Sequence, residues 1–303
     1  MSANLASYAK RIAVALALAV PNAGFAATCD ATLIPTASMA RLDYDPFAFT
    51  RPVERITFDV ESRANAACEV EFVLLDQTRT AVSSTTIGSS GVQVGFIAST
   101  GDAALVPTAV PGTWRASLQP GTRTRLAIQA IVTQDAVASA GEHATPLSLE
   151  LRDVGALATM VAPMPVSVVL AVVPRAQMNI VGAIATFGQG QSVAQVDFGV
   201  LASNATRRVF LQIRADTTAR LTIDSANAGR LLPEGDLREM DSIAYSAALS
   251  GVPVDLTQHW EDIVDPPRTL AGTSLPLDIT LGALGPHLAG TYSDTLTIVL
   301  SAL

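Results

Sequence analysis

The sequence predicts an all-β protein made of two tandem β-sandwich domains. Hydrophobic residues form 49% of the 303 residues and charged residues 15%, which is enough apolar material for two cores and argues against disorder. The apolar residues are mostly Ala, Val, Leu and Ile, and over short stretches they alternate with polar residues. Alternation with a period of two indicates half-buried strands.

A pattern that occurs twice, about 130 residues apart, indicates that the two domains are homologous. Residues 146–151 match 276–281, and at the same offset of 130 the apolar positions Val166, Val168 and Leu170 fall on Leu296, Ile298 and Leu300. Residues 57–60 match 197–200 at an offset of 140. A repeat this long indicates two domains, because a solenoid has shorter periods and at least three copies.

Residues 1–26 have the pattern of a signal peptide. Lys10 and Arg11 precede an apolar run over 12–20, and Gly24 and Ala26 are small residues of the kind that signal peptidase reads. The run is shorter than the about 20 residues that span a bilayer. We therefore expect the mature chain to begin at residue 27 and to be exported without membrane insertion.

The mature chain is acidic. Lys10 and Arg11 lie in the signal, so 17 of the 19 basic residues remain against 27 Asp and Glu. Such a chain has no basic field that would hold nucleic acid or anionic lipid by releasing counterions. We expect no nucleic-acid partner.

Cys29 and Cys68 are the only cysteines. In an oxidising compartment an even pair is most simply a disulfide, and closing a loop of 39 residues would stabilise the first domain by roughly 4 kcal/mol. A thiol nucleophile or a metal site would need histidines clustered with the cysteines, and the sequence shows none.

The strands are predicted in two groups. In the N-terminal domain, 27–174, they are 29–34, 55–60, 68–75, 92–97, 114–118, 125–132, 147–151 and 166–173. In the C-terminal domain, 175–303, they are 178–181, 193–200, 209–213, 220–223, 243–249, 277–281 and 295–300. Turn-forming residues separate nearly all of them, and this number and spacing of strands is typical of a β-sandwich. The junction near Pro174 has no Gly/Ser tether, so we expect domains arranged end to end with limited freedom.

Several segments resemble one known family. They are the start of the mature chain around Cys29 and the segments 44–47, 227–231, 243–245 and 290–298. Together they resemble the spore coat protein U domain, a family that includes the subunits of archaic chaperone–usher pili. The resemblance covers the second domain nearly end to end and only the opening of the first.

The resemblance implies an immunoglobulin-like fold in which the C-terminal domain is an incomplete pilin-type sandwich without its last strand. The missing strand leaves a groove of unpaired backbone groups, and a buried hydrogen bond left unmade costs about 1 to 3 kcal/mol. In this family a periplasmic chaperone lends a strand, and the N-terminal extension of the adjacent subunit replaces it, with an outer-membrane usher as a further partner. The acceptor is the last strand, with Leu296, Ile298 and Leu300.

The position of Cys29 indicates a place in the fibre. Cys29 lies two residues after the expected cleavage site, which leaves no segment to donate to a neighbour. A subunit that accepts a strand but donates none ends the fibre. The expectation is therefore a pilus-tip adhesin at the cell surface, which attaches cells to surfaces in biofilms through its N-terminal domain. The alternative is a non-adhesive structural subunit or a secreted coat protein.

Two apolar segments are candidates for the contact surface. The strand 166–173 runs toward the linker, so the preceding loop, 152–165, lies at the opposite end of the domain. Its candidate residues are Val154, Leu157, Met160, Val161 and Met164, which would form an exposed patch unless they fold back over the core. The insertion over 95–114 offers Phe96, Ile97, Leu105, Val106, Val110 and Trp114, with packing on the sandwich as the other interpretation. Phe47 and Phe49 are expected in the core.

Catalytic and metal motifs are not apparent. His143, His259 and His287 lie in separate contexts, and no Gly-x-Ser-x-Gly motif occurs. The acidic residues 261–265 near His259 precede two prolines and are interpreted as a solvated loop. A secreted hydrolase without a recognisable motif is the remaining enzyme hypothesis, and we expect no enzyme, cofactor or metal.

Overall fold

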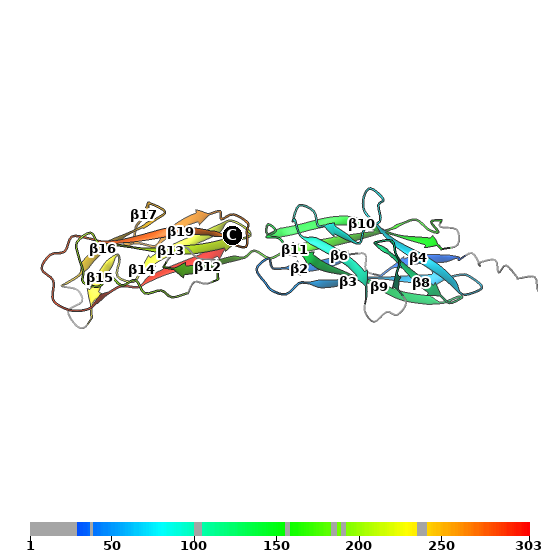
Figure 1. The fold of residues 1–303 in the computed structure, drawn as a ribbon, viewed down its shortest axis with the longest axis horizontal. Coiled ribbons are helices and arrows are strands. Elements are labelled where there is room, and N and C mark those ends of the chain that lie inside the picture. The colour runs from blue at the N-terminus through cyan, green and yellow to red at the C-terminus, as the bar shows by residue number, and fades with distance from the viewer. Residues whose placement is uncertain are drawn as a thin grey trace, which may run out of the picture.

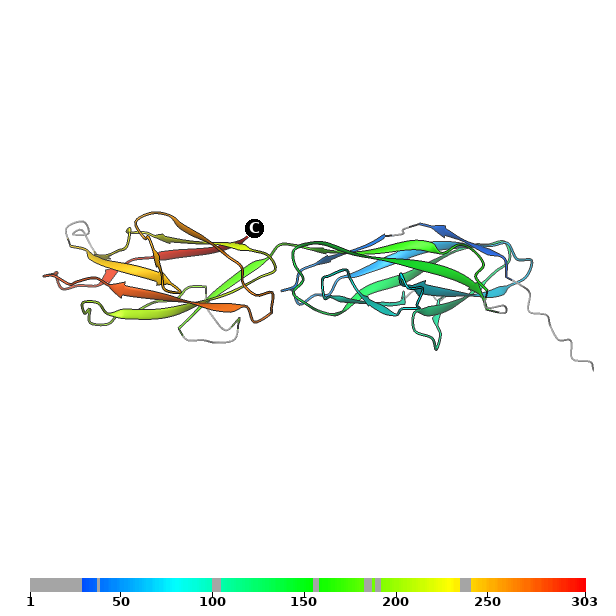
Figure 2. The same ribbon diagram turned by 90° about the horizontal axis from the view of Figure 1, so that it is seen from above.

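The computed structural model is all-β and describes residues 29–36, 39–99, 105–154, 158–182, 187–188, 192–234 and 241–303. Two sandwiches lie end to end along the long axis of the molecule, the N-terminal domain on the right and the C-terminal domain on the left (Figure 1, Figure 2). The predicted signal lies outside the described residues. Within the described part of the chain, no helix is long and apolar enough to cross a membrane.

The N-terminal domain is a complete sandwich of two sheets. Its strands are β1 (Ala31–Pro35), β2 (Met39–Tyr44), β3 (Val53–Ser62), β4 (Cys68–Leu75), β5 (Ser84–Thr86), β6 (Gln93–Ala98), β7 (Val106–Pro107), β8 (Thr113–Leu118), β9 (Arg123–Gln134), β10 (Gly141–Asp153) and β11 (Met164–Val172). One sheet has the order β1-β3-β9-β6-β5 and the other β2-β11-β10-β4-β8-β7. The last strand, β11, pairs antiparallel with β10 and parallel with β2.

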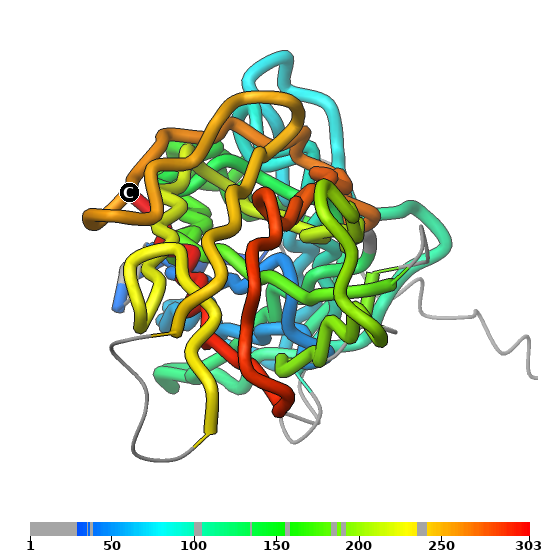
Figure 3. The backbone as a smooth tube through the Cα atoms, turned by 90° about the vertical axis from the view of Figure 1, so that its left-hand side faces the viewer, coloured from blue at the N-terminus to red at the C-terminus, as the bar shows by residue number. Residues whose placement is uncertain are grey.

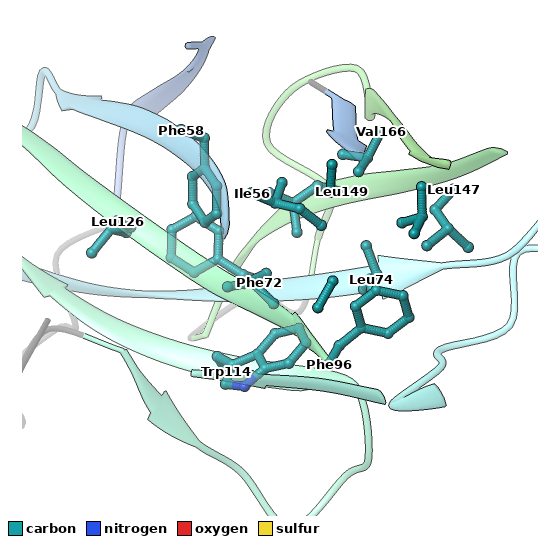
Figure 4. Packing of buried hydrophobic residues seen from close by; sticks show 14 of the residues in the cluster. Ile56, Phe58, Phe72, Leu74, Phe96, Trp114, Leu126, Leu147, Leu149 and Val166 are labelled. Atoms are coloured by element: carbon teal, nitrogen blue, oxygen red, sulfur yellow. The ribbon is translucent and has the colours of Figure 1, made fainter. Parts of the chain in front are cut away.

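Large apolar side chains from the two sheets meet in the core of this domain. The rings of Phe58 on β3 and Phe72 on β4 lie 5.3 Å apart between their centroids, and Trp114 packs on the same core (Figure 4). The predicted disulfide between Cys29 and Cys68 is present and ties the chain ahead of β1 to the first residue of β4. The disulfide therefore joins the two sheets at one end of the sandwich.

The C-terminal domain is also built from two sheets, but one of them has only three strands among the described residues. Its strands are β12 (Ala176–Val181), β13 (Thr206–Ala215), β14 (Ala219–Ser225), β15 (Arg230–Pro233), β16 (Ile243–Leu249), β17 (Val252–Val254), β18 (Trp260–Val264), β19 (Thr273–Leu281), β20 (Tyr292–Ser293) and β21 (Leu296–Ala302). One sheet has the order β12-β13-β19-β16-β15-β20, with β17 beside β16, and the other is β18-β14-β21.

The two domains share part of their strand order, but not in the way the sequence repeat predicts. The run β3-β9-β6 of the first domain has the same topology as β13-β19-β16 of the second, and the pair β4 and β10 corresponds to β14 and β21. The match of 146–151 to 276–281 is therefore wrong by one strand, because 147–151 lie in β10 whereas 277–281 lie in β19. Neighbouring strands of one sandwich share the same alternating apolar pattern, so a short ungapped match does not separate them. By this correspondence β11 has no counterpart among the described residues of the C-terminal domain.

Two further segments differ from the sequence prediction. The predicted strand 193–200 lies in no sheet, although Val196 and Phe198 pack on the core while Val193 and Val200 are exposed. Core-facing and exposed residues do alternate along this segment, but it has no strand partner in the described part of the domain. Conversely, the acidic segment near His259, interpreted as a loop, is strand β18 paired with β14.

Direct contacts connect the domains at the junction. The amide of Arg175 donates to Asp216 Oδ1 at 2.7 Å, and the amide of Asp216 donates to the Arg175 carbonyl at 3.1 Å. From the N-terminal domain, the amide of Ala140 donates to the Asp216 carbonyl at 3.1 Å, and Asp45 pairs with the Arg175 guanidinium at 2.9 Å. These contacts explain how a linker without extra residues holds two domains end to end.

Candidate functional site

The outer edge of β21 is the most distinctive feature of the C-terminal domain. β21 pairs with β14 on one side, and no strand of the described residues pairs with its other side. Leu296 is opposite Ser225 and Ala302 is opposite Ala219, so β21 runs from the far end of the domain back to the junction. Figures 1 and 2 show the C-terminus there, between the two domains. The edge therefore presents a row of unpaired backbone donors and acceptors along the length of the domain.

The side chains of β21 are only partly covered. Leu296, Ile298 and Leu300 point to the core yet are each intermediate in exposure, and they alternate with exposed Thr297, Val299 and Ser301. The equivalent strand β10 gives an internal comparison. There Leu147, Leu149 and Leu151 are 5%, 0% and 0% exposed, because β10 has β11 as a neighbour. The difference follows from the absence of a neighbouring strand beside β21.

A second wall of the same opening comes from β12, which lies near β21. Met178 and Ile180 of β12 are partly buried and pack on the same core as Leu296, Ile298 and Leu300. The family resemblance pointed to the residues on β21 but not to those on β12. The alternation over 178–181 is too short to show that this strand borders an opening, because only the pairing of sheets reveals that.

The segments that carry the family resemblance meet at the start of β21. The hydroxyls of Tyr245 and Ser225 both donate to Asp294 Oδ2 at 2.6 Å, and the amide of Gly229 donates to Ser225 Oγ at 2.8 Å. Burial, together with its hydrogen bond to the Asp294 carboxylate, raises the pKa of Tyr245 above its usual range. Residues 227–231, 243–245 and 290–298 thus hold the first residue of β21 in place, which is a structural role.

A second polar cluster lies on the neighbouring loops. Asp241 accepts hydrogen bonds from His287 Nδ1 at 2.5 Å, from the amide of Leu288 at 2.7 Å and from the Tyr292 hydroxyl. These hydrogen bonds, of which the one from Tyr292 is the strongest influence, lower the pKa of Asp241 to about 2. Asp241 is therefore ionised throughout the physiological range.

The predicted contact loop 152–165 folds back over its own domain. Met164 is buried, Met160 and Val161 pack on the core, Val154 is partly buried, and Leu157 lies outside the described residues. The amide of Met160 donates to the Leu151 carbonyl at 2.9 Å, and the Thr159 hydroxyl donates to the buried Glu150 at 2.5 Å. The described part of this loop is thus anchored, and Met164 is not available on the surface.

The insertion over 95–114 divides into buried and exposed residues. Phe96, Leu105 and Trp114 are core residues, whereas Ile97, Val106 and Val110 are 46%, 59% and 55% exposed. β7 pairs with β8, which holds the insertion against the domain. Gly112 is required where it passes Val82, because it has φ +73° and an added Cβ would lie 2.4 Å from the Val82 carbonyl oxygen. Three of the six predicted contact residues therefore remain on the surface.

The aromatic residues before β3 do not both belong to the core. Phe47 is buried, but it packs under the guanidinium of Arg214 from the C-terminal domain. Phe49 is fully exposed, so the prediction that it lies in the core is wrong. Both residues follow β2 on the loop that faces the junction, where the side chains leave the interior of the sandwich.

The three histidines lie apart, each with a local partner. His143 Nε2 lies 2.9 Å from the Ser139 carbonyl, His259 Nδ1 lies 2.8 Å from Asp224, and His287 contacts Asp241. The described residues contain no group of three or more His, Cys, Asp or Glu side chains placed to hold a metal ion. The open edge of β21 is therefore the candidate functional site.

No protein-family model and no curated protein matches the sequence. Among solved structures, the chain is similar to one from the chaperone–tip adhesion subunit pre-assembly complex of the archaic chaperone–usher Csu pili of Acinetobacter baumannii. The identity is 10%, over 89% of this chain and 100% of that one, with a TM-score of 0.42. A tip adhesin from Pseudomonas aeruginosa is 10% identical over 90% of this chain and 93% of its own, with a TM-score of 0.42. The CooA pilin subunit from enterotoxigenic Escherichia coli is 16% identical over 48% of this chain and 99% of its own, with a TM-score of 0.27.

Proposed function

We propose that this protein is a two-domain subunit at the tip of an archaic chaperone–usher pilus. Its C-terminal domain accepts a strand from another chain along β21, and its N-terminal domain attaches the cell to a surface, as in a biofilm. The observation that carries the proposal is the contrast between two equivalent strands. Leu147, Leu149 and Leu151 are covered by a strand of their own domain, whereas Leu296, Ile298 and Leu300 are not.

An added strand would complete the C-terminal domain in two ways. It would pair with the free backbone groups of the seven residues of β21, and it would cover the apolar side chains of β21 and β12. Full burial of one apolar side chain stabilises a fold by about 1.5 to 3 kcal/mol. The apolar side chains of β21 and β12 are already partly buried, so an added strand would contribute a substantial fraction of this stabilisation for each.

The asymmetry of the chain favours a terminal position in the fibre. The N-terminal domain has its own last strand, β11, and needs none from a partner. Only one of the two domains therefore offers a site for fibre assembly, and the other is free for contact with a surface. In the proposed assembly a periplasmic chaperone first occupies the edge of β21, an adjacent pilin then replaces it, and the outer-membrane usher exports the product.

For attachment we propose the exposed apolar side chains of the insertion, Ile97, Val106 and Val110. Ile97 lies on β6 and Val106 on β7, and these two strands are in contact, while Val110 lies in the loop between β7 and β8. Apolar patches of this kind usually mark interaction sites. The 152–165 loop remains a second candidate through its partly exposed Val154, Met160 and Val161.

One observation favours a second function, that of a structural subunit or coat protein without a ligand. Met164, Phe96, Leu105 and Trp114 are buried, so part of the apolar material predicted for adhesion serves the core instead. Attachment assays on cells that carry the exposed-residue variants distinguish the two functions.

A fused strand tests the acceptor role. An alternating apolar segment linked after Leu303 should fold back beside β21 and raise the stability of the C-terminal domain by roughly 3 kcal/mol or more. The matched control carries the same segment with its apolar positions changed to Ser, and should give no gain. Hydrogen exchange should show new protection of the β21 amides only in the first fusion. Equal stability of the two fusions would contradict the acceptor role.

A further inference from the structure

The far end of the C-terminal domain carries an apolar loop that the proposed function does not use. β19 ends and β21 begins at this end, because Leu281 lies opposite Tyr245 and Leu296 opposite Ser225. The connecting residues 282–291, here called the pole loop, lie there together with Asp241. Figure 3 looks directly onto this end of the molecule, with the N-terminal domain behind it.

The pole loop is unusually apolar for a surface segment. Its ten residues include no Asp, Glu, Lys or Arg, in a chain with 15% charged residues. Leu288 is 55% exposed, and Ala283, Pro286 and Ala289 are exposed beside it. Among its larger apolar side chains only Leu284 is partly buried, so the apolar surface of the loop is not explained by packing on the core.

Hydrogen bonds hold this apolar loop in one shape. The amide of Gly285 donates to His287 Nε2 at 3.3 Å, so that Nδ1 carries the proton that faces Asp241. Asp241 also accepts the amide of Leu288, and the Tyr292 hydroxyl lies 2.9 Å from the Leu288 carbonyl. The amide of Leu288 is thus fixed by Asp241 while its side chain is exposed. A loop ordered in advance loses little entropy when a partner binds.

The direction of a strand added beside β21 determines which part of the partner chain lies near the pole loop. In the N-terminal domain β11 runs antiparallel to β10. A strand that takes the same place beside β21 runs from the Ala302 end, at the junction, to the Leu296 end. Its chain therefore leaves the C-terminal domain at the pole loop, and whatever domain follows that strand lies next to Leu288.

We propose that the pole loop, with Leu288 at its centre, is the docking surface for the body of the subunit that supplies the strand. This inference rests on the proposed function, and it adds a second contact between the two subunits outside the groove. The docked body must present an apolar surface, because the pole loop offers exposed aliphatic side chains and no charge.

Two probes separate docking from strand addition. The donating subunit is isolated from its complex with this chain. It is then used whole, with its own acceptor groove filled by a fused strand, and as a synthetic peptide of its N-terminal segment. Binding of each probe is measured to the full chain and to the variants Leu288→Ser and Val252→Ser. Val252 is 58% exposed on β17, away from the pole, and is the matched control (Figure 1).

The expected result is selective. Leu288→Ser should weaken binding of the whole subunit by about tenfold, the usual effect of losing a central contact residue, and leave binding of the peptide unchanged. Val252→Ser should change neither. Equal binding of the whole subunit to all three chains would overturn the docking surface while the proposed function stands. Failure of the peptide to bind the unaltered chain would overturn the proposed function, and the docking surface with it.

Discussion

The guanidinium of Arg214, on β13 of the C-terminal domain, lies over the ring of Phe47 of the N-terminal domain, 4.5 Å from the ring centroid. The centroid of the Phe187 ring lies 4.1 Å from the same guanidinium. Arg214 also donates to the Leu270 carbonyl at 3.1 Å and to Gln177 at 2.6 Å. One cation thus joins the loop before β3 to three segments of the other domain.

Replacing Arg214 should loosen the junction. A cation–π contact contributes about 0.5 to 2 kcal/mol, and Arg214→Ala removes two of them. We expect a broader distribution of interdomain distances by small-angle scattering and faster proteolysis near Pro174. Arg208→Ala is the control, because Arg208 lies on the same strand but pairs with Asp278 of its own domain. An unchanged distance distribution in Arg214→Ala would show that the hydrogen bonds of Asp216 hold the junction without it.

Asp216 gives the junction a dependence on pH. Burial raises the pKa of Asp216, with a further rise from Asp45, while the amides of Arg175 and of Asp216 itself and the charge of Arg175 lower it. A carboxyl with a raised pKa in the folded state adds stability that is fully present below its unfolded pKa and is lost as pH rises through the folded pKa. Asp216→Asn should therefore be more stable than the unaltered chain at pH 7 and lose that advantage at pH 3.

Asp278 is the control of opposite sign for that measurement. The hydrogen bond from Arg208 lowers the pKa of Asp278, so its contribution is present above the unfolded pKa and is lost as pH falls through the folded pKa. Asp278→Asn should lower stability at pH 7 and change little at pH 3. If Asp216→Asn lowered the stability at pH 7, as Asp278→Asn should, the pKa of Asp216 would not be raised in the folded state.

Much of the fold could be predicted because a strand with one buried face has alternating apolar and polar residues. The strands at 68–75 and 243–249 have the predicted bounds, and the predicted pairing of Cys29 with Cys68 is present. The opening beside β21 was also expected, but through the family resemblance. The physical evidence for this opening is that the apolar side chains of β21 are more exposed than those of β10. Recognising these two strands as equivalent requires the pattern of strand pairing in the structure.

Other features depend on contacts that are distant in sequence. β2 was not predicted, although its side chains alternate between exposed and buried, because its partner β11 follows more than a hundred residues later. The burial of Met164 depends on how the preceding loop folds back, and alternation carries no such information. Phe49 was expected in the core, yet its place on the junction loop leaves it in solvent.

Removing the disulfide should affect one domain only. Cys68→Ser opens a loop of 39 residues in the N-terminal domain, which should lower the stability of that domain by roughly 4 kcal/mol. The C-terminal domain shares no part of this loop, so its unfolding transition should stay in place in a calorimetric scan. Equal losses in both transitions would indicate that the domains unfold as one unit. Alkylation of the unaltered protein before reduction is the control, and it should label no cysteine.

Tyr245 should support the start of β21 through Asp294. Its hydroxyl donates to Asp294, two residues ahead of the strand. Tyr245→Phe removes a hydrogen bond to a charged group, which should lower the stability of the C-terminal domain by about 1.5 to 3 kcal/mol. If the bond also positions the acceptor edge, the variant should bind a donor peptide more weakly, as measured by titration calorimetry. Unchanged stability would show that the bond contributes nothing to the start of β21.

Attachment itself is tested on the exposed residues of the insertion. The double variant Val106→Ser and Val110→Ser removes two side chains that are 59% and 55% exposed, so folding and export should be unaffected. If these residues contact the surface, adhesion of cells carrying the variant fibres should fall by about tenfold or more, because weak contacts multiply across many fibres. Met160→Ser and Val161→Ser, which alter partly exposed side chains packed on the core, should instead lower the amount of exported protein, because they remove apolar contacts with the core. Full adhesion by the Val106 and Val110 variant, with normal fibre numbers by electron microscopy, would exclude these two residues as contacts and leave Ile97 and the 152–165 loop as the remaining candidates.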